Sequence, residues 1–273
     1  MDTKVLGKPL NRIEGRLKVT GAAQYAADHR PKGTACAYGV RSEIASGETL
    51  SVDATEAQQA PGVLYISHAI ESPNFFRCPE SVSVGEQRPP FEDRKIYYAG
   101  QLVAVVVAET LAQARWAARL LKIKYRENSD QIVDFEQALS ERELKVTDQG
   151  GRGVAAQQFR DSAAKIDESY FSSVESHCAM ELHASTAWWE GTRLIVEDST
   201  QWVVGQRKAL ANTFGIPESD VEVRSKFVGG GFGSKLFIWP HCILAAEAAR
   251  RLGRPVQYMM DRSSNFTTAG NRP

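Results

Sequence analysis

The stretch IYYAGQLVAVVVAETLAQARWAARLLKIKY, Ile96 to Tyr125, decides the fold class of this chain. YAG is a turn sequence, and the LVAVVVA that follows it is rich in the β-branched residues that strands favour. ETLAQARWAARLL then repeats apolar residues at helical spacing, and KIKY returns to a short strand. We predict a helix with Thr110 as its N-cap, whose Ala112, Trp116 and Leu120 share one face and pack on the sheet. A strand, helix, strand unit is therefore expected.

Sequence upstream of this unit adds further strands to the same region. ACAYGVRS (35–42) and GVLYIS (62–67) have the composition of strands. DATEAQQAPG between them is typical of a short helix that Pro61 and Gly62 close. The fold class is therefore α+β, and we expect a first domain over residues 1–145.

Downstream of this domain, polar sequence leads into a second region of strands and helices. Residues 146–164, which contain the cluster GGRG, predict a linker. KIDESYFS (165–172), ASTAWWEG, RLIVEDST and VEVRSKFVGG predict strands, while VGQRKALANTFG and HCILAAEAARRLG predict helices. We expect a second α/β domain over residues 165–273.

Composition excludes several classes of partner. The chain has 273 residues, and its 33 basic residues balance its 33 acidic ones, so neither a nucleic acid nor an anionic membrane surface is expected to bind it. LVAVVVA is far shorter than the ~20 apolar residues of a membrane-spanning helix. The N-terminus has no apolar signal segment and no twin arginines, which favours a cytoplasmic location.

The cysteines and histidines show no metal-binding pattern. Cys36, Cys78, Cys178 and Cys242 are widely scattered, which favours reduced core residues over an iron–sulfur cluster or a structural zinc site. His177 and His183 flank MEL without forming an HExxH motif. We expect structural roles for both histidines.

The glycine-rich stretch VGGGFGSKLF, Val228 to Phe237, predicts close approach of the backbone to a ligand. A P-loop needs glycine directly before the lysine, and a Rossmann motif needs a third glycine at position 234, where Ser234 stands. Both nucleotide motifs therefore fail on spacing. An ordinary strand-to-helix turn is the alternative, but Phe232 between glycines would give a flat ligand an apolar wall.

Four stretches in order resemble one family. VGGGFG (Val228 to Gly233) resembles the cofactor motif in the large molybdenum subunit of the xanthine dehydrogenase and aldehyde oxidoreductase family. The other stretches that resemble segments of these subunits, in the same order, are NRIEGRLKVTGAAQYAAD (11–28), IYYAGQLVAVVVAETLAQARWAARLLKIKY (96–125), and MELHASTAWWEG (180–191) with STQ (199–201). The resemblance implies an N-terminal α/β hammerhead domain, followed by the first part of a molybdenum-cofactor-binding domain. The chain is most similar to bacterial aldehyde oxidoreductase subunits.

The resemblance also implies roles for five residues. Gln201 would hydrogen-bond an oxo ligand of molybdenum through its side-chain amide. Gly230, Gly231 and Gly233 would bring backbone amides to the pterin and the metal oxygens, with Phe232 beside the metal. The protein would donate no direct metal ligand, because the pterin holds molybdenum through sulfur. The alternatives are a polar residue at a strand end for Gln201 and ordinary core packing for Phe232.

Two departures from the family pattern bear on the substrate. The family commonly has a second glycine where Ser234 stands, and its xanthine-oxidising members have glutamate where Leu236 stands. Loss of that carboxylate disfavours purines. The resemblance therefore implies an aldehyde or another N-heterocycle as substrate, oxidised with water as the oxygen source.

Family subunits are much longer, and their general-base glutamate lies downstream of the region matched here. We therefore expect no catalytic base in this chain, and we expect Glu181 to be a structural or polar-network residue. The resemblance implies that this chain is one part of a molybdenum-dependent oxidoreductase and is incomplete alone. It would work with iron–sulfur and FAD subunits, and with a chain that supplies the rest of the molybdenum domain. A dinucleotide form of molybdopterin is expected.

Two alternatives stay open at this stage. The chain could be a truncated, inert remnant or an interaction module that keeps the hammerhead fold without cofactor. Export to the periplasm on the twin-arginine signal of a partner is the alternative to a cytoplasmic location.

Overall fold

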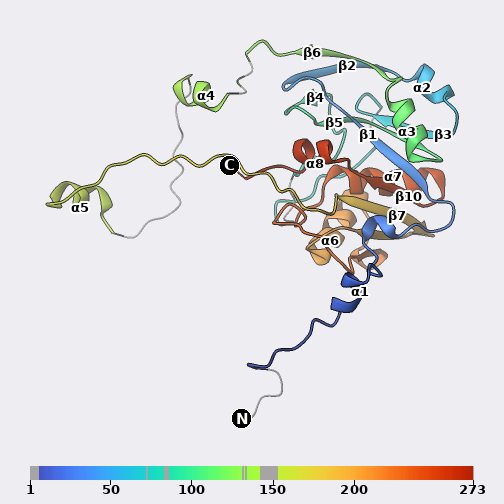
Figure 1. Cartoon of the computed structure of the whole chain (residues 1–273). Coiled ribbons are helices and arrows are strands. Elements are labelled where there is room, and N and C mark those ends of the chain that lie inside the picture. The colour runs from blue at the N-terminus through green and yellow to red at the C-terminus, as the bar shows by residue number, and fades with distance from the viewer. Residues whose placement is uncertain are drawn as a thin grey trace.

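Two β-sheets and the helices packed on them form the body of the molecule (Figure 1). The computed structural model describes residues 6–71, 73–82, 86–130, 132, 134–141 and 153–272. Its strands are β1 (Ala35–Arg41), β2 (Gly47–Asp53), β3 (Val63–His68), β4 (Lys95–Ile96), β5 (Leu102–Ala108), β6 (Lys122–Glu127), β7 (Ala184–Glu190), β8 (Arg193–Asp198), β9 (Val221–Arg224) and β10 (Val256–Met259). Its helices are α1 (Gly15–Val19), α2 (Thr55–Gln59), α3 (Leu111–Ala118), α4 (Phe135–Glu141), α5 (Ala155–Asp161), α6 (Val203–Phe214), α7 (Pro240–Leu252) and α8 (Arg262–Thr268), with 3₁₀ turns η1 (Ala26–Asp28) and η2 (Glu218–Asp220).

The larger sheet has seven strands in the order β3-β5-β1-β10-β7-β8-β9. Every residue of β5 is buried, as expected for the apolar run LVAVVVA. β1 pairs antiparallel with β5 and parallel with β10, in a register that places Ala35 opposite Val256. Strands from both predicted domains therefore belong to one sheet. The domain boundaries stay a prediction.

A second sheet of three strands, in the order β4-β2-β6, lies beside the first. β2 and β4 were not predicted, because GETLSVD has a mixed polar composition and β4 has only two residues. β6 contains the predicted strand KIKY and pairs antiparallel with β2. The predicted strand, helix, strand unit is therefore present, but its two strands belong to different sheets.

Helix α3 begins as predicted but packs through a different face. The Thr110 hydroxyl accepts a hydrogen bond from the Gln113 amide N–H, and the Gln113 side chain accepts one from the Thr110 N–H. This capping box satisfies the first free N–H groups of the helix. Its buried residues are Ala114, Ala117 and Ala118, so the predicted face was wrong, and Trp116 is 58% exposed. Small alanines let the helix approach the β-branched sheet closely, which the larger residues would prevent.

Helices α6 and α7 position the second half of the chain. α7 packs on β7 and β10, and residues from His241 to Ala249 are buried along it. Trp189 of β7 anchors this contact by donating its indole N–H to the carbonyl of Ala246, at 2.9 Å. Both helices end at a left-handed glycine, Gly215 and Gly253, as their sequences predict.

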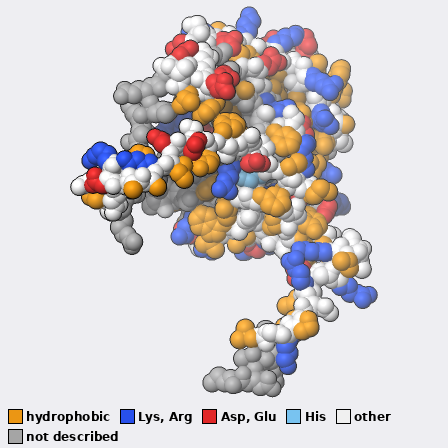
Figure 2. All heavy atoms as spheres, turned by 60° about the vertical axis from the view of Figure 1, so that its left-hand side comes forward, with side chains coloured by type: hydrophobic (Ala, Val, Ile, Leu, Met, Phe, Trp, Pro, Cys, Tyr) orange, Lys and Arg blue, Asp and Glu red, His pale blue; other side chains and the backbone are white. Residues whose placement is uncertain are grey.

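Figure 1 shows α5 outside the body of the molecule, and the segment after it as an extended stretch of chain that leads back to the body. KIDESYFS (165–172) was predicted as a strand, and this prediction was wrong, because the segment has no ladder partner among the described residues. Its Ile166, Tyr170 and Phe171 side chains are exposed, and Figure 2 shows apolar side chains on this arm. In the predicted linker, residues 153–164 include the exposed helix α5, and residues 146–152 lie outside the described residues. In the described part of the chain, no helix is long and apolar enough to cross a bilayer.

The Thr110→Ala substitution tests the capping box. It should lower the free energy of unfolding by about 1 kcal/mol, because it leaves the Gln113 N–H without its acceptor. Urea denaturation followed by circular dichroism measures this change. Thr192→Ala, in an exposed turn, is the matched control and should stay within about 0.5 kcal/mol of the parent chain. Equal losses for the two variants would contradict the assignment.

Candidate functional site

The structure brings Gln201 and the glycine loop together, although 28 or more residues separate them in sequence. Gln201 follows the end of β8, and the loop lies between β9 and α7. The Gln201 side-chain oxygen accepts hydrogen bonds from the N–H groups of Gly233 and Lys235, at 3.2 and 3.3 Å. The Gln201 backbone N–H donates to the Lys235 carbonyl at 2.8 Å. Because its oxygen faces the loop, the Gln201 side-chain NH₂ is left to donate to a ligand.

Three of the loop positions need glycine, two for their backbone conformation and one for lack of space. Gly230 and Gly233 have φ values of +98° and +97°, which side chains rarely adopt. A Cβ on Gly231 would lie 2.3 Å from the Gln201 side-chain oxygen. Phe232 itself has a φ of +52°, which is uncommon for an aromatic residue and marks a constrained backbone.

The middle of the loop presents hydrogen-bond donors. The N–H groups of Gly230, Gly231 and Phe232 have no hydrogen-bond partner among the residues that the structure describes. Successive free N–H groups in a loop with alternating backbone handedness form a nest that attracts anionic atoms. The Phe232 side chain is 71% exposed, so the alternative of ordinary core packing was wrong. The loop therefore combines polar donors with an exposed aromatic ring.

A buried ion pair lies beneath this loop. The Lys235 side chain is 0% exposed, and its ammonium donates to a Glu181 carboxylate oxygen at 2.8 Å. Burial lowers the pKa of Lys235, and the contact with Glu181 opposes this shift. Glu181 is thus a polar-network residue, as expected from the sequence. The spacing of the motif excludes a P-loop role for Lys235, and nothing in the sequence predicted this ion pair.

Further buried polar groups lie behind the pair. A His183 ring nitrogen lies 3.3 Å from the Ser234 carbonyl, and burial lowers the pKa of His183 to about 4. A ring nitrogen of His241 lies 3.9 Å from Asp198, which also accepts a hydrogen bond from the Ser185 hydroxyl. Burial raises the pKa of Asp198 to about 6. His183 thus has the structural role predicted for it, through its contact with Ser234 of the loop. Asp198 and His241 were not predicted from the sequence.

The cysteines and His177 do not form a metal-binding group among the described residues. Cys36, Cys78 and Cys242 are buried, as expected, but Cys178 is exposed, which corrects its prediction as a core residue. The His177 Nδ1 atom is buried and has no partner among the described residues. Within that part of the chain, no three His, Cys, Asp or Glu side chains form a group that could hold a metal.

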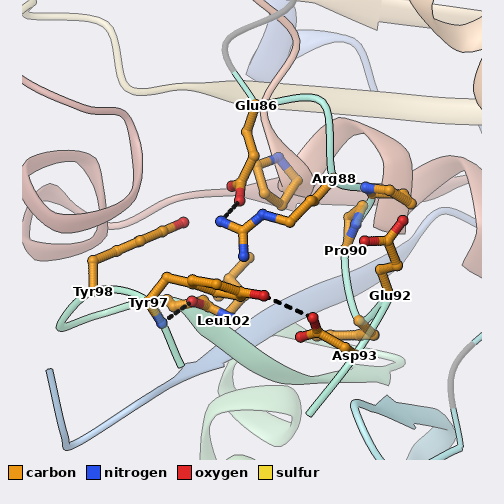
Figure 3. A pocket seen from close by; sticks show the side chains of 12 residues that line it. Glu86, Arg88, Pro90, Glu92, Asp93, Tyr97, Tyr98 and Leu102 are labelled. Carbon is orange, nitrogen blue, oxygen red and sulfur yellow. Dashed lines mark hydrogen bonds and ion pairs between the residues drawn. The ribbon is translucent and has the colours of Figure 1, made fainter. Parts of the chain in front are cut away.

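Two neighbouring cavities share Glu86, Arg88 and Tyr98 in their walls. The smaller one, of about 30 Å³, has room for little more than water. Figure 3 shows its polar side chains bonded among themselves: Arg88 contacts Glu86, and the Tyr97 hydroxyl donates to Asp93 at 2.8 Å. It is therefore a poor ligand site.

The larger cavity, of about 600 Å³, is open and has aromatic walls from Tyr98, Trp239 and Phe266. Trp239 connects it to the loop, because its indole N–H donates to the Ser234 carbonyl at 2.5 Å. This cavity is large enough for a small aromatic molecule.

The raised pKa of Asp198 makes a prediction about stability. A buried carboxyl with a raised pKa binds its proton more tightly in the folded state, so the fold loses stability as pH rises through about 6. Relative to Asp198→Asn, the parent chain should lose about 2 kcal/mol between pH 4 and pH 7. Urea unfolding at a series of pH values measures this difference. A difference between the two chains that stays constant with pH would contradict the assignment.

Comparison with known proteins identifies both regions of the chain. Residues 20–129 match the family profile described as "Aldehyde oxidase and xanthine dehydrogenase, a/b hammerhead domain". Residues 137–273 match "Molybdopterin cofactor-binding domain". The resemblance seen in the sequence motifs is thus confirmed.

Two bacterial relatives and one solved structure support the same assignment. The aldehyde oxidoreductase molybdenum-binding subunit PaoC of Escherichia coli (strain K12) is 38% identical over 99% of this chain and 37% of its own length. The putative xanthine dehydrogenase molybdenum-binding subunit XdhA of the same strain is 30% identical, over 96% of this chain and 37% of its own length.

Quinoline 2-oxidoreductase from Pseudomonas putida 86 superposes with a TM-score of 0.82 and 30% identity, over 97% of this chain and 36% of that one. The predicted α+β fold class, a hammerhead domain before a cofactor-binding region, is confirmed. The chain spans little more than a third of the length of these relatives. It belongs to the aldehyde oxidase and xanthine dehydrogenase family of molybdenum-cofactor proteins.

Proposed function

We propose that this chain provides one wall of the cofactor site in a molybdenum hydroxylase, an oxidoreductase that oxidises an aldehyde or an N-heterocycle with water as the oxygen source. The observation that carries the proposal is the loop from Gly230 to Phe232, whose N–H groups have no partner among the described residues. A Cβ on Gly231 would strike the Gln201 side chain, so the close contact between Gln201 and the loop requires glycine there, which supports the proposal.

The loop residues divide the work of holding molybdenum–molybdopterin. When bound, the cofactor would supply the redox centre that takes up two electrons from the substrate. The N–H groups of Gly230, Gly231 and Phe232 would donate hydrogen bonds to its oxygen or sulfur atoms. The positive φ of Gly233 would set the turn that orients these N–H groups. The Gln201 NH₂ would donate one more, and the Phe232 ring would exclude water beside the metal. None of these residues would be a direct metal ligand.

The surroundings of the loop support the substrate class. The cavity of about 600 Å³ has three aromatic walls that suit a flat molecule. Leu236, 39% exposed at the end of the loop, offers no carboxylate to a purine. The names of the aldehyde oxidoreductase and the quinoline 2-oxidoreductase agree with this choice, whereas XdhA is named as a putative xanthine dehydrogenase subunit. We therefore favour an aromatic aldehyde or an N-heterocycle.

Other parts of the site would come from outside the matched region. The relatives are longer, and we propose that their remaining length corresponds to a part that supplies the general-base glutamate. The exposed Ile166, Tyr170, Phe171 and Val174 side chains would pack against that part. Iron–sulfur and FAD subunits would take the electrons away, and the cofactor would be a dinucleotide form. A cytoplasmic location, with export on a partner as the alternative, stays a prediction.

An inert remnant or a pure interaction module is the competing function. Such a chain would have no use for a constrained loop with free N–H groups, and its Gly230, Gly231 and Gly233 would be free to vary. The intact contact between Gln201 and this loop favours the enzyme.

Metal content tests the proposed function. The chain, co-expressed with the polypeptides encoded beside it and purified as a complex, should contain about one molybdenum atom per copy by mass spectrometry. It should oxidise benzaldehyde with at least about tenfold higher kcat/KM than hypoxanthine, because no carboxylate stands at Leu236. In H₂¹⁸O, the label should enter the benzoate product. A complex without molybdenum would refute the enzyme and leave the inert remnant.

Gly231→Ala tests the cradle. The new Cβ would displace the Gln201 side chain and break its hydrogen bonds to Gly233 and Lys235. The molybdenum content of the purified complex should fall by about tenfold or more. Gly15→Ala is the matched control, since its Cβ would make only an ordinary contact 3.5 Å from Arg12. Full molybdenum content in the Gly231 variant would show that the loop does not hold the cofactor.

A further inference from the structure

Lys235 is an unusual residue to find in a protein core. Its ammonium is fully buried, and the burial of a lone charge is so costly that lysine is almost never enclosed without a partner. Glu181 is the partner, but a buried ion pair is on balance no more stabilising than a well-packed apolar pair. Stability alone therefore does not account for the choice of these two residues.

The Glu181 carboxylate connects the two ends of the glycine loop. Its Oε2 atom accepts the Gly229 N–H at 2.7 Å, where the loop begins. The same atom accepts the Lys235 ammonium at 2.8 Å, where the loop ends. One oxygen atom thus joins both ends of the seven-residue segment 229–235, which we call the loop segment.

Backbone contacts hold the two ends on either side of this oxygen. The Glu181 N–H donates to the Gly229 carbonyl at 3.1 Å, and the Lys235 ammonium also donates to the Glu181 carbonyl at 3.0 Å. On the other side, the Lys235 carbonyl accepts from the Gln201 N–H and from the Thr200 hydroxyl. Position 181 and position 201 therefore hold the loop segment between them.

The fit at the first end is close. A Cβ on Gly229 would lie 2.7 Å from the Glu181 Cβ, so the backbone of the loop segment rests directly on the Glu181 side chain. The free N–H groups of Gly230, Gly231 and Phe232 lie between the two fixed ends. Because both ends are held by hydrogen bonds, the backbone that carries these donors is held between two fixed points.

We propose that Glu181 and Lys235 are positioning residues, a buried clasp that holds the loop segment in the conformation that receives the anionic atoms of the cofactor. The proposal rests on the function proposed above. The clasp acts through the backbone and touches neither cofactor nor substrate. It prepares the site before the cofactor arrives, which lowers the ordering cost of binding.

A double variant separates this role from plain stability. Lys235→Met alone leaves the Glu181 carboxylate buried without its cation, so both stability and loop order should fall. In Glu181→Gln/Lys235→Met no buried charge is left, and the Gln side chain still accepts the Gly229 N–H. Methionine cannot donate to that side chain, so position 235 loses its bond to position 181 and keeps only its backbone bonds to Thr200 and Gln201.

Hydrogen exchange on the chain purified without cofactor is the first measurement. The double variant should recover most of the stability lost in Lys235→Met. The hydrogen-bonded amides of Gly233, Ser234, Lys235 and Leu236 should nevertheless exchange about tenfold faster than in the parent chain. Exchange in β7 and β8 should match the parent. Loop protection equal to that of the parent would overturn the clasp, whatever the result for molybdenum.

Cofactor loading of the complex is the second measurement. Molybdenum content should fall several-fold in the double variant, in spite of its recovered stability. The control pair Glu109→Gln/Arg254→Met removes an ion pair with contacts of 2.8 and 2.9 Å far from the loop segment, and it should load fully. If the parent loads molybdenum and the double variant loads equally well, the clasp is refuted while the proposed function stands. If the parent loads none, both are refuted.

Discussion

The hydrogen bonds between the Gln201 side-chain oxygen and the glycine loop are the constraint on which the site depends. They require the backbone of the loop to come so close that no Cβ fits at Gly231. They also fix which atom of the Gln201 amide faces the protein, and so leave its NH₂ outside. A strand end and a loop that begins about 30 residues further along become one surface through this contact. The surface has donors, no carboxylate of its own, and one exposed aromatic ring.

The large sheet explains how that surface is held in place. β10 lies between β1 and β7, so strands from the start and the end of the chain are neighbours. α7 covers β7 and β10, and it begins shortly after the loop, at Pro240. The loop is thus tied to a sheet edge on one side and to a buried helix on the other. Such support on rigid elements is what a site needs to keep its donors in place.

Much of the fold could be predicted from the sequence, and the failures have physical causes. β5, β7, β8, α6 and α7 followed from runs of β-branched residues and from helical spacing. β10 has only four residues and gains its identity from pairing with β1, which no local pattern reveals. KIDESYFS has the composition of a strand, but composition cannot supply a neighbouring strand. For α3 the predicted buried face included the large residues Trp116 and Leu120. The face that packs on the sheet consists instead of alanines, because small side chains allow close packing.

The part of the site that depends on backbone conformation could be predicted, because that conformation requires glycine at particular positions. Glycines at 230, 231 and 233 could be assigned to a loop that approaches a ligand, because glycine is needed there for steric reasons. A polar-network role was predicted for Glu181, but the burial of Lys235 was not, since lysine side chains are mostly exposed. Only the fold reveals that a salt bridge lies beneath the loop.

The most direct test of the account is the structure of the purified complex by electron cryomicroscopy, with attention to the loop from Gly230 to Phe232. The account predicts density for a molybdenum centre whose oxygen or sulfur atoms lie about 3 Å from these backbone nitrogens and from the Gln201 NH₂. A loop whose N–H groups are instead bonded to other protein groups, with the metal elsewhere, would contradict it.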